Sequence, residues 1–236
     1  MNVGSNKMKK LSLCLEVELA IYYIKKGIRE INRISLSNDF YHLPILCLTS
    51  GFERLMKCVL ITDSYISHKN FPPNKTKYLK GSLGHNLNRL LDEMITIGKN
   101  SKSLMSKEAT KIDIDYMENN EEFRSLILIL TDFATLGRYH NIDSLFKTTS
   151  DPIQDFMEFE YKIAAKNNID IGIGKDPYKR INKIIVLIIE KFTRGLCRFF
   201  TLGDFEDVGK LLSINTYDFL MLRDDQLGKC EYLKEN

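Results

Sequence analysis

Two polar segments inside otherwise apolar helical patterns carry the side chains best suited to chemistry. In residues 50–57, Glu53 and Lys57 stand four residues apart where the periodicity predicts a mostly buried helix. At that spacing a carboxylate and an ammonium group share one helix face, and an exposed pair contributes only about 0.3–0.5 kcal/mol. The neighbouring residues are apolar, so the alternative is a partly buried structural ion pair that organises the bundle or faces a site.

The second segment, residues 83–91, is typical of a new helix with His85 at its N-cap or first position. Free N–H groups at a helix N-terminus favour anions. Arg89 follows one turn later and Lys80 precedes the helix, so the sequence predicts a site for a phosphate-bearing ligand. The alternatives are an exposed basic turn, or a first-turn histidine that bonds the preceding loop.

A third polar cluster, Arg138 and His140, ends the apolar helix expected over residues 119–139. Basic groups at a helix C-terminus are favoured by the helix dipole, which makes capping one interpretation. The other is ligand binding, because a guanidinium that leaves an apolar helix must find an acceptor. The remaining histidines, His42 and His68, flank another predicted helix and are expected to be exposed.

Metal and cofactor chemistry has no signature in this chain. The four histidines are too far apart for metal-ligand spacing, and no GxSxG, HExxH or cysteine–histidine pattern occurs. The cysteines form no CxxC pair, which predicts reduced thiols, most of them in the core. They are Cys14, Cys47, Cys58, Cys197 and Cys230. We therefore expect no metal and no cofactor.

Composition favours a soluble, cytoplasmic protein. Its 34 basic and 31 acidic residues give a net charge of +3, too even for a dedicated nucleic-acid coat. The longest purely apolar run, residues 184–189, is far short of the roughly 20 residues that span a bilayer. Glu16 and Glu18 interrupt the apolar stretch that would otherwise imitate a signal peptide. We expect no membrane partner.

Helical periodicity dominates the chain and predicts an all-α fold in a single domain, residues 1–236. The expected helices cover residues 9–35, 43–67, 84–97, 107–112, 119–139, 152–167, 177–202 and 204–212. The helix over 119–139 is apolar almost all round, which is typical of a helix surrounded by others, so we expect it at the centre. Its predicted core residues are Phe123, Leu126, Ile127, Leu130 and Phe133.

Residues 10–145 resemble the HEPN superfamily of helical bundles. The resemblance is carried by Glu53-x-x-x-Lys57 in a long helix, a proline-containing loop, His85-x-Leu-x-x-Leu-Leu, and an apolar helix that ends in Arg138-Tyr139. It implies an up-and-down bundle and a homodimer. It also implies either RNase activity or a non-catalytic nucleotide- or RNA-binding module. From the order of the helices we expect those of residues 151–212 to pack on this bundle.

The chain departs from this family at its catalytic motif. Catalytic members carry Arg-x(4–6)-His, and no histidine here has an arginine at those positions. Lys80-x(4)-His85 comes nearest, but lysine lacks the planar fork of arginine. The leading hypothesis is therefore a non-catalytic protein that binds RNA or a nucleotide in a defence or stress system. The alternative is an RNase or nucleotide-processing enzyme with His85 or His140 as general acid or base.

Overall fold

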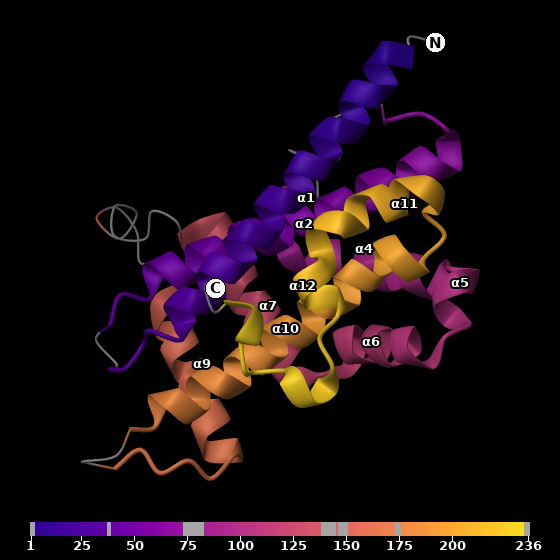
Figure 1. Cartoon of the computed structure of the whole chain (residues 1–236). Helices are drawn as coiled ribbons and strands as arrows, with labels where there is room; N and C mark the ends of the chain where they lie inside the picture. The colour runs from indigo at the N-terminus through magenta and orange to yellow at the C-terminus, as the bar shows by residue number, and fades with distance from the viewer. Residues whose placement is uncertain are drawn as a thin grey trace.

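The computed structural model describes residues 3–36, 39–72, 83–137, 145, 151–172 and 176–233. Every regular element in this part of the chain is helical, which confirms the all-α class (Figure 1). The longer helices are α1 (Val3–Ile31), α2 (His42–His68), α4 (Leu87–Asn100), α6 (Glu108–Asn119), α7 (Glu121–Asp132), α9 (Pro152–Lys166) and α10 (Tyr178–Leu202). None of the described helices is long and apolar enough to cross a membrane.

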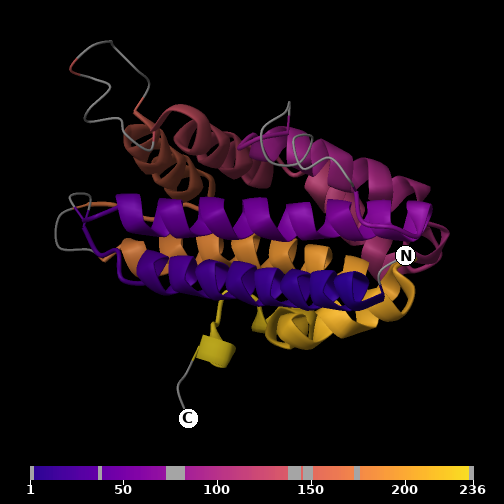
Figure 2. The same cartoon turned by 90° about the horizontal axis from the view of Figure 1, so that it is seen from above.

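Helices α1 and α2 form an antiparallel pair that lies side by side along most of its length (Figure 2). Two glycines allow the close approach. A Cβ on Gly51 would lie 2.6 Å from Cγ1 of Ile24, and a Cβ on Gly27 would lie 2.7 Å from Cγ of Leu48. Real Cβ atoms do not approach so closely, so the helix spacing depends on the missing side chains. This pairing fixes where α2 presents its polar residues.

Helix α10 occupies the centre of the bundle, and the prediction that residues 119–139 would do so is wrong. It contacts α1, α2, α6, α7 and α9, together with the short helices α5 (Lys102–Met105), α11 (Glu206–Ser213) and α12 (Tyr217–Leu220). The ring of Phe192 on α10 lies 5.0 Å from that of Phe52 on α2 and 4.4 Å from that of Phe123 on α7. These three rings join the two halves of the chain through one aromatic cluster.

The helix predicted over 119–139 is in fact shorter and is not enclosed on all sides. Helix α7 ends at Asp132, and a π-helical segment, η1 (Phe133–Gly137), continues it. The five predicted core residues are all fully buried, as expected. However, Leu128 and Leu136 are more than half exposed, because α2, α4, α6, α9 and α10 pack against the other faces. Apolar composition alone did not reveal this open face.

Helix boundaries follow the local capping chemistry. Asp151 caps α9, because its side chain accepts hydrogen bonds from the backbone N–H groups of Ile153 and Gln154. Asp176 does not cap α10, since Pro177 holds the N-cap position and α10 begins at the next residue. Helix α6 is longer than the expected 107–112 because Asn120 serves both to end it and to cap α7.

The chain after α11 is held by a buried carboxylate on α10. Glu190 is fully buried and accepts hydrogen bonds from the backbone N–H of Gly228 at 2.5 Å and from the hydroxyl of Tyr232 at 2.8 Å. Residues 214–233 contain the short elements η2 (Ile214–Thr216), α12, η3 (Asp224–Gln226) and η4 (Glu231–Leu233). No sequence pattern predicted a role for these residues, which cover one side of α10.

A second buried carboxylate, Glu160 on α9, faces the start of α2. Its Oε2 accepts a hydrogen bond of 2.8 Å from the hydroxyl of Tyr41, whereas its Oε1 is buried without a hydrogen-bond partner. Burial raises the pKa of Glu160 to about 7, and the Tyr41 hydrogen bond opposes this shift only in part. A carboxyl group in this position favours its neutral form.

Replacing Leu130 with alanine should lower the free energy of unfolding by about 2–5 kcal/mol, because it removes a fully buried side chain and leaves a cavity. Leu128 offers a matched control two residues away on the same helix. It is exposed, so Leu128→Ala should change stability by less than about 0.5 kcal/mol. Urea unfolding of both variants measures the difference, and equal losses would contradict the described burial.

Glu160 should make the protein less stable as the pH rises. The folded pKa of about 7 lies above the ordinary value of 4.5, so the folded state keeps a proton that the unfolded chain has lost. The stabilisation is complete below pH 4.5 and is lost as the pH rises towards 7, in total on the order of 3 kcal/mol. Glu160→Gln cannot ionise. Subtracting its urea-unfolding profile from that of the wild type at pH 4–8 should isolate this slope, and parallel profiles would refute it.

Candidate functional site

The Glu53–Lys57 pair lies largely inside the bundle. Lys57 Nζ donates a hydrogen bond to Glu53 Oε1 at 2.6 Å, and the two side chains are only 9% and 12% exposed. They belong to a stretch of α2 that also buries Phe52, Leu55 and Met56 completely. The pair is therefore not an exposed surface contact, and of the two interpretations of this spacing the structure supports the partly buried one.

His85 reaches the same carboxylate from a different part of the chain. Its Nδ1 lies 3.0 Å from Oε2 and 3.1 Å from Oε1 of Glu53. The carboxylate thus bridges Lys57 and His85, so two of the three polar segments singled out in the sequence meet at one group. Half of the His85 side chain remains exposed. The ring is anchored on one side and open to solvent on the other.

His85 does not cap helix α4, which corrects the prediction. Asn86 is the N-cap, and its side chain accepts a hydrogen bond from the backbone N–H of Arg89 at 2.9 Å. Asparagine caps helices better than histidine, because its side-chain oxygen reaches the first-turn N–H groups. His85 instead lies in the turn before the helix, where Gly84 has a positive φ of 21°. The turn directs the ring towards α2.

The start of this helix leaves few backbone N–H groups free for the predicted anion site. Three backbone N–H groups that would have bound a phosphate already donate inside the protein: those of Asn86 to the Leu83 carbonyl, of Asn88 to the Thr131 hydroxyl, and of Arg89 to the Asn86 side chain. Arg89 is exposed on α4 and does not line the cleft that contains His85. Lys80, Arg138 and His140 lie outside the described residues.

The electrostatics of the site keep Glu53 ionised. Burial on its own raises the pKa of this carboxyl, but the hydrogen bonds and positive charge of Lys57 and His85 outweigh it, and the pKa ends below its ordinary value. An ionised carboxylate accepts hydrogen bonds and cannot donate them. His85 must therefore donate through Nδ1, which leaves Nε2 as the acceptor nitrogen of the neutral ring.

A cleft of about 420 Å³ opens beside these residues. Glu16 of α1 and a series of α2 residues form its walls, and His85 closes one side. Arg54 Nη1 donates to Glu16, and its guanidinium lies 5.7 Å from the centre of the Tyr23 ring. Cys58 also lines the cleft, but burial raises the pKa of its thiol, so it is not an activated nucleophile. The lining residues are Glu16, Ser50, Glu53, Arg54, Lys57, Cys58, Ile61 and His85.

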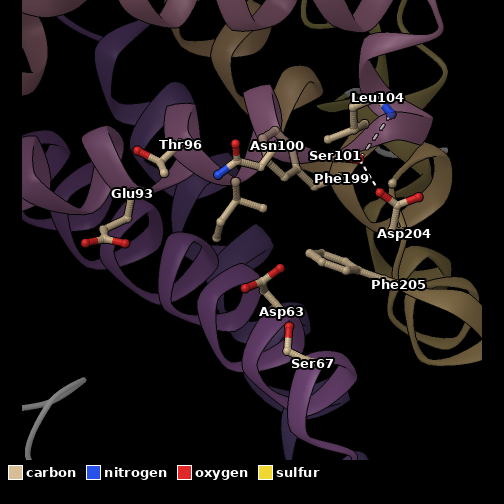
Figure 3. Close-up of a pocket in the computed structure, with 12 residues that line it drawn as sticks. Asp63, Ser67, Glu93, Thr96, Asn100, Ser101, Leu104, Phe199, Asp204 and Phe205 are labelled. Atoms are coloured by element: carbon tan, nitrogen blue, oxygen red, sulfur yellow. Dashed lines mark hydrogen bonds between the residues drawn. The ribbon is translucent and has the colours of Figure 1, made fainter.

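A second cavity, of about 400 Å³, lies at the other end of α4 and was not found from the sequence (Figure 3). Asp63, Glu93 and Asp204 contribute acidic groups to its lining, and Phe205 closes it from one side. Hydrogen bonds from Ser103 and Ser101 lower the pKa of Asp204, whereas burial raises the pKa of Asp63. The negative lining of this cavity disfavours phosphate-bearing ligands, so the cleft at His85 is the better candidate site.

No cluster of three or more metal-ligating side chains occurs among the described residues. Comparison with models of protein families, with curated proteins and with solved structures finds no match to this chain. The geometry of the cleft is therefore the basis on which a function can be proposed.

Removing only one member of the Glu53–Lys57 pair should lower the free energy of unfolding. Glu53→Ala leaves the ammonium group of Lys57, a residue that is 7% exposed, without its carboxylate, and we expect unfolding to become easier by about 3 kcal/mol. The double variant Glu53→Leu/Lys57→Met removes both charges and should recover most of that loss. Urea unfolding of the three proteins provides the measurement. A double variant as unstable as Glu53→Ala would show that the pair is not the cause.

Proposed function

We propose that this protein is a HEPN-like binding protein whose cleft at Glu53 and His85 takes a phosphate-bearing ligand, either a nucleotide or a short stretch of RNA. The observation that carries the proposal is the cluster of Arg54, Lys57 and His85 around one cleft, with Glu53 holding two of them in place. The motif resemblance in residues 10–145 and the all-helical architecture support the family assignment.

The cleft has more hydrogen-bond donors than its own carboxylates use. The guanidinium of Arg54 has five N–H groups and the ammonium of Lys57 has three, and a single carboxylate partner does not satisfy such a set. Glu16 and Glu53 balance the two permanent positive charges, so protonation of His85 would give the cleft a net positive charge. A phosphate group supplies both the acceptors and the negative charge that this arrangement lacks.

The Glu53–His85 contact favours a second function at the same cleft. A histidine held through Nδ1 by a carboxylate presents Nε2 as a general base, and that role needs no arginine four to six residues before it. In RNA, Nε2 of His85 would remove the proton of a 2′-hydroxyl as its oxygen attacks the adjacent phosphorus. The leaving 5′-oxygen then takes a proton from solvent water, and Nε2 releases the proton that it removed back to solvent. Arg54 and Lys57 would stabilise the charge on the phosphorane.

One experiment tests binding and cleavage together. A fluorescently labelled 12-nucleotide single-stranded RNA is titrated with wild-type protein, Arg54→Gln and Arg89→Gln in EDTA, and each mixture is then resolved by electrophoresis. Loss of a charged hydrogen-bond donor should weaken binding by about tenfold in Arg54→Gln. Arg89 lies outside the cleft, so Arg89→Gln should bind about as tightly as the wild type.

The outcomes separate the two functions. Binding without cleavage supports the non-catalytic protein. Metal-independent cleavage that disappears in His85→Gln, while binding persists, supports the RNase. Equal weakening in the two arginine variants, or no binding of RNA or of ATP by the wild type, would remove this cleft from consideration.

A further inference from the structure

Helix α1 has a second apolar face that nothing in the described part of the chain covers. Its buried face, which includes Leu13, Val17 and Ile24, packs in the core. Large apolar side chains also follow one another at helical spacing on the opposite face, and each is between 37% and 61% exposed. These residues, the α1 stripe, are Met8, Leu11, Leu15, Leu19 and Tyr22.

The exposed apolar surface extends beyond α1. Helix α11 and the turn η2 contact α1, and the Asn215 side chain donates a hydrogen bond to the Cys14 carbonyl. Next to this contact Leu211 and Ile214 are exposed as well. Figure 2 shows α1 on the outside of the bundle with α11 beside it. Contiguous apolar patches of this kind mark interaction surfaces rather than ordinary exposed residues.

The order of charges along α1 indicates what kind of partner covers the α1 stripe. Lys7 and Glu18 are eleven residues apart, which is about three helical turns, so both side chains lie on the same edge of the stripe. Both are exposed, and neither forms an ion pair with another described residue of its own chain. On the other edge, Lys9 lies over the Phe71 ring and Glu16 pairs with Arg54, so Lys7 and Glu18 are the charges left for a partner.

We propose that the α1 stripe is the interface of a homodimer, in which two copies of α1 pack antiparallel about a twofold axis near residues 12 and 13. This arrangement places Lys7 beside the partner's Glu18 and, by symmetry, Glu18 beside the partner's Lys7. It brings Leu11 close to the level of the partner's Leu15 and lays the stripe, which is about 21 Å long, along the partner's α1. Parallel packing would instead set like charges against each other.

The same charge order disfavours a membrane as the occupant. The basic cluster of Lys7, Lys9 and Lys10 would attract anionic headgroups. Glu18, however, lies at the edge of the stripe and would be pressed against the same surface. A second copy of the chain offers an opposite charge to both Lys7 and Glu18, whereas an anionic lipid surface attracts only the lysine. This inference does not depend on the ligand proposed for the cleft.

Sedimentation equilibrium over a range of protein concentrations tests the interface. Wild-type protein should sediment as a dimer, and Leu15→Lys, which changes an exposed residue, should sediment as a folded monomer. Leu128→Lys makes the same change at an exposed leucine on α7 and should remain dimeric. Circular dichroism of each variant verifies that the helices are retained. A monomeric wild type, or equal dissociation of the two lysine variants, would overturn the proposal.

A charge exchange tests the antiparallel arrangement separately. Lys7→Glu should weaken the dimer by about tenfold or less, since rim ion pairs contribute modestly, and Lys7→Glu/Glu18→Lys should restore it. A double variant as weak as the single one would contradict the pairing. Flotation with vesicles of phosphatidylcholine and phosphatidylserine tests whether a lipid surface binds the α1 stripe instead. Binding that Leu15→Lys abolishes, by a protein that sediments as a monomer, would replace the dimer with a lipid surface.

Discussion

Burying a carboxylate is unfavourable unless donors surround it, and the candidate site is built around one such group. The carboxylate of Glu53 on α2 accepts a hydrogen bond from the ammonium of Lys57 on one side and contacts the imidazole of His85 on the other. Burial raises the pKa of this carboxyl, but the hydrogen bonds and charges of the two partners together outweigh burial and keep the carboxylate ionised within the bundle. In return it fixes the orientation of His85 and joins the turn before α4 to α2. The stability and the chemistry of the site therefore depend on the same interaction.

The surrounding helices determine how this group is presented. Gly27 and Gly51 let α1 approach α2 so closely that Glu16 reaches Arg54 across the cleft. Helix α10 packs behind α2 and joins it to α7 through the ring of Phe192. This packing encloses the Glu53–Lys57 pair, whose side chains are only 12% and 9% exposed, so the pair is preorganised. Preorganised donors bind anions and stabilise developing charge better than mobile ones.

Sequence patterns predicted the parts of this structure that depend on neighbouring residues. Periodicity located the long helices and the buried face of α7, and the four-residue spacing predicted the Glu53–Lys57 pair. The contact between Glu53 and His85 joins residues 32 positions apart, and no local pattern encodes it. Asn86, a stronger N-cap than histidine, was the signal that would have placed His85 outside the helix. Residue type also predicts that a glutamate such as Glu160 is exposed, so the buried carboxylates were missed.

The central claim is that Glu53 holds His85 through Nδ1 and leaves Nε2 open. Nitrogen-15 NMR of histidine-labelled protein distinguishes the two neutral tautomers directly, and His85→Gln assigns the signal among the four histidines. At a pH where the ring is neutral, His85 should be protonated at Nδ1 in the wild type. In Glu53→Gln it should lose this preference, because an amide no longer requires a donor from the ring. A His85 signal that shows the Nε2-protonated tautomer, or one that Glu53→Gln leaves unchanged, would contradict the account.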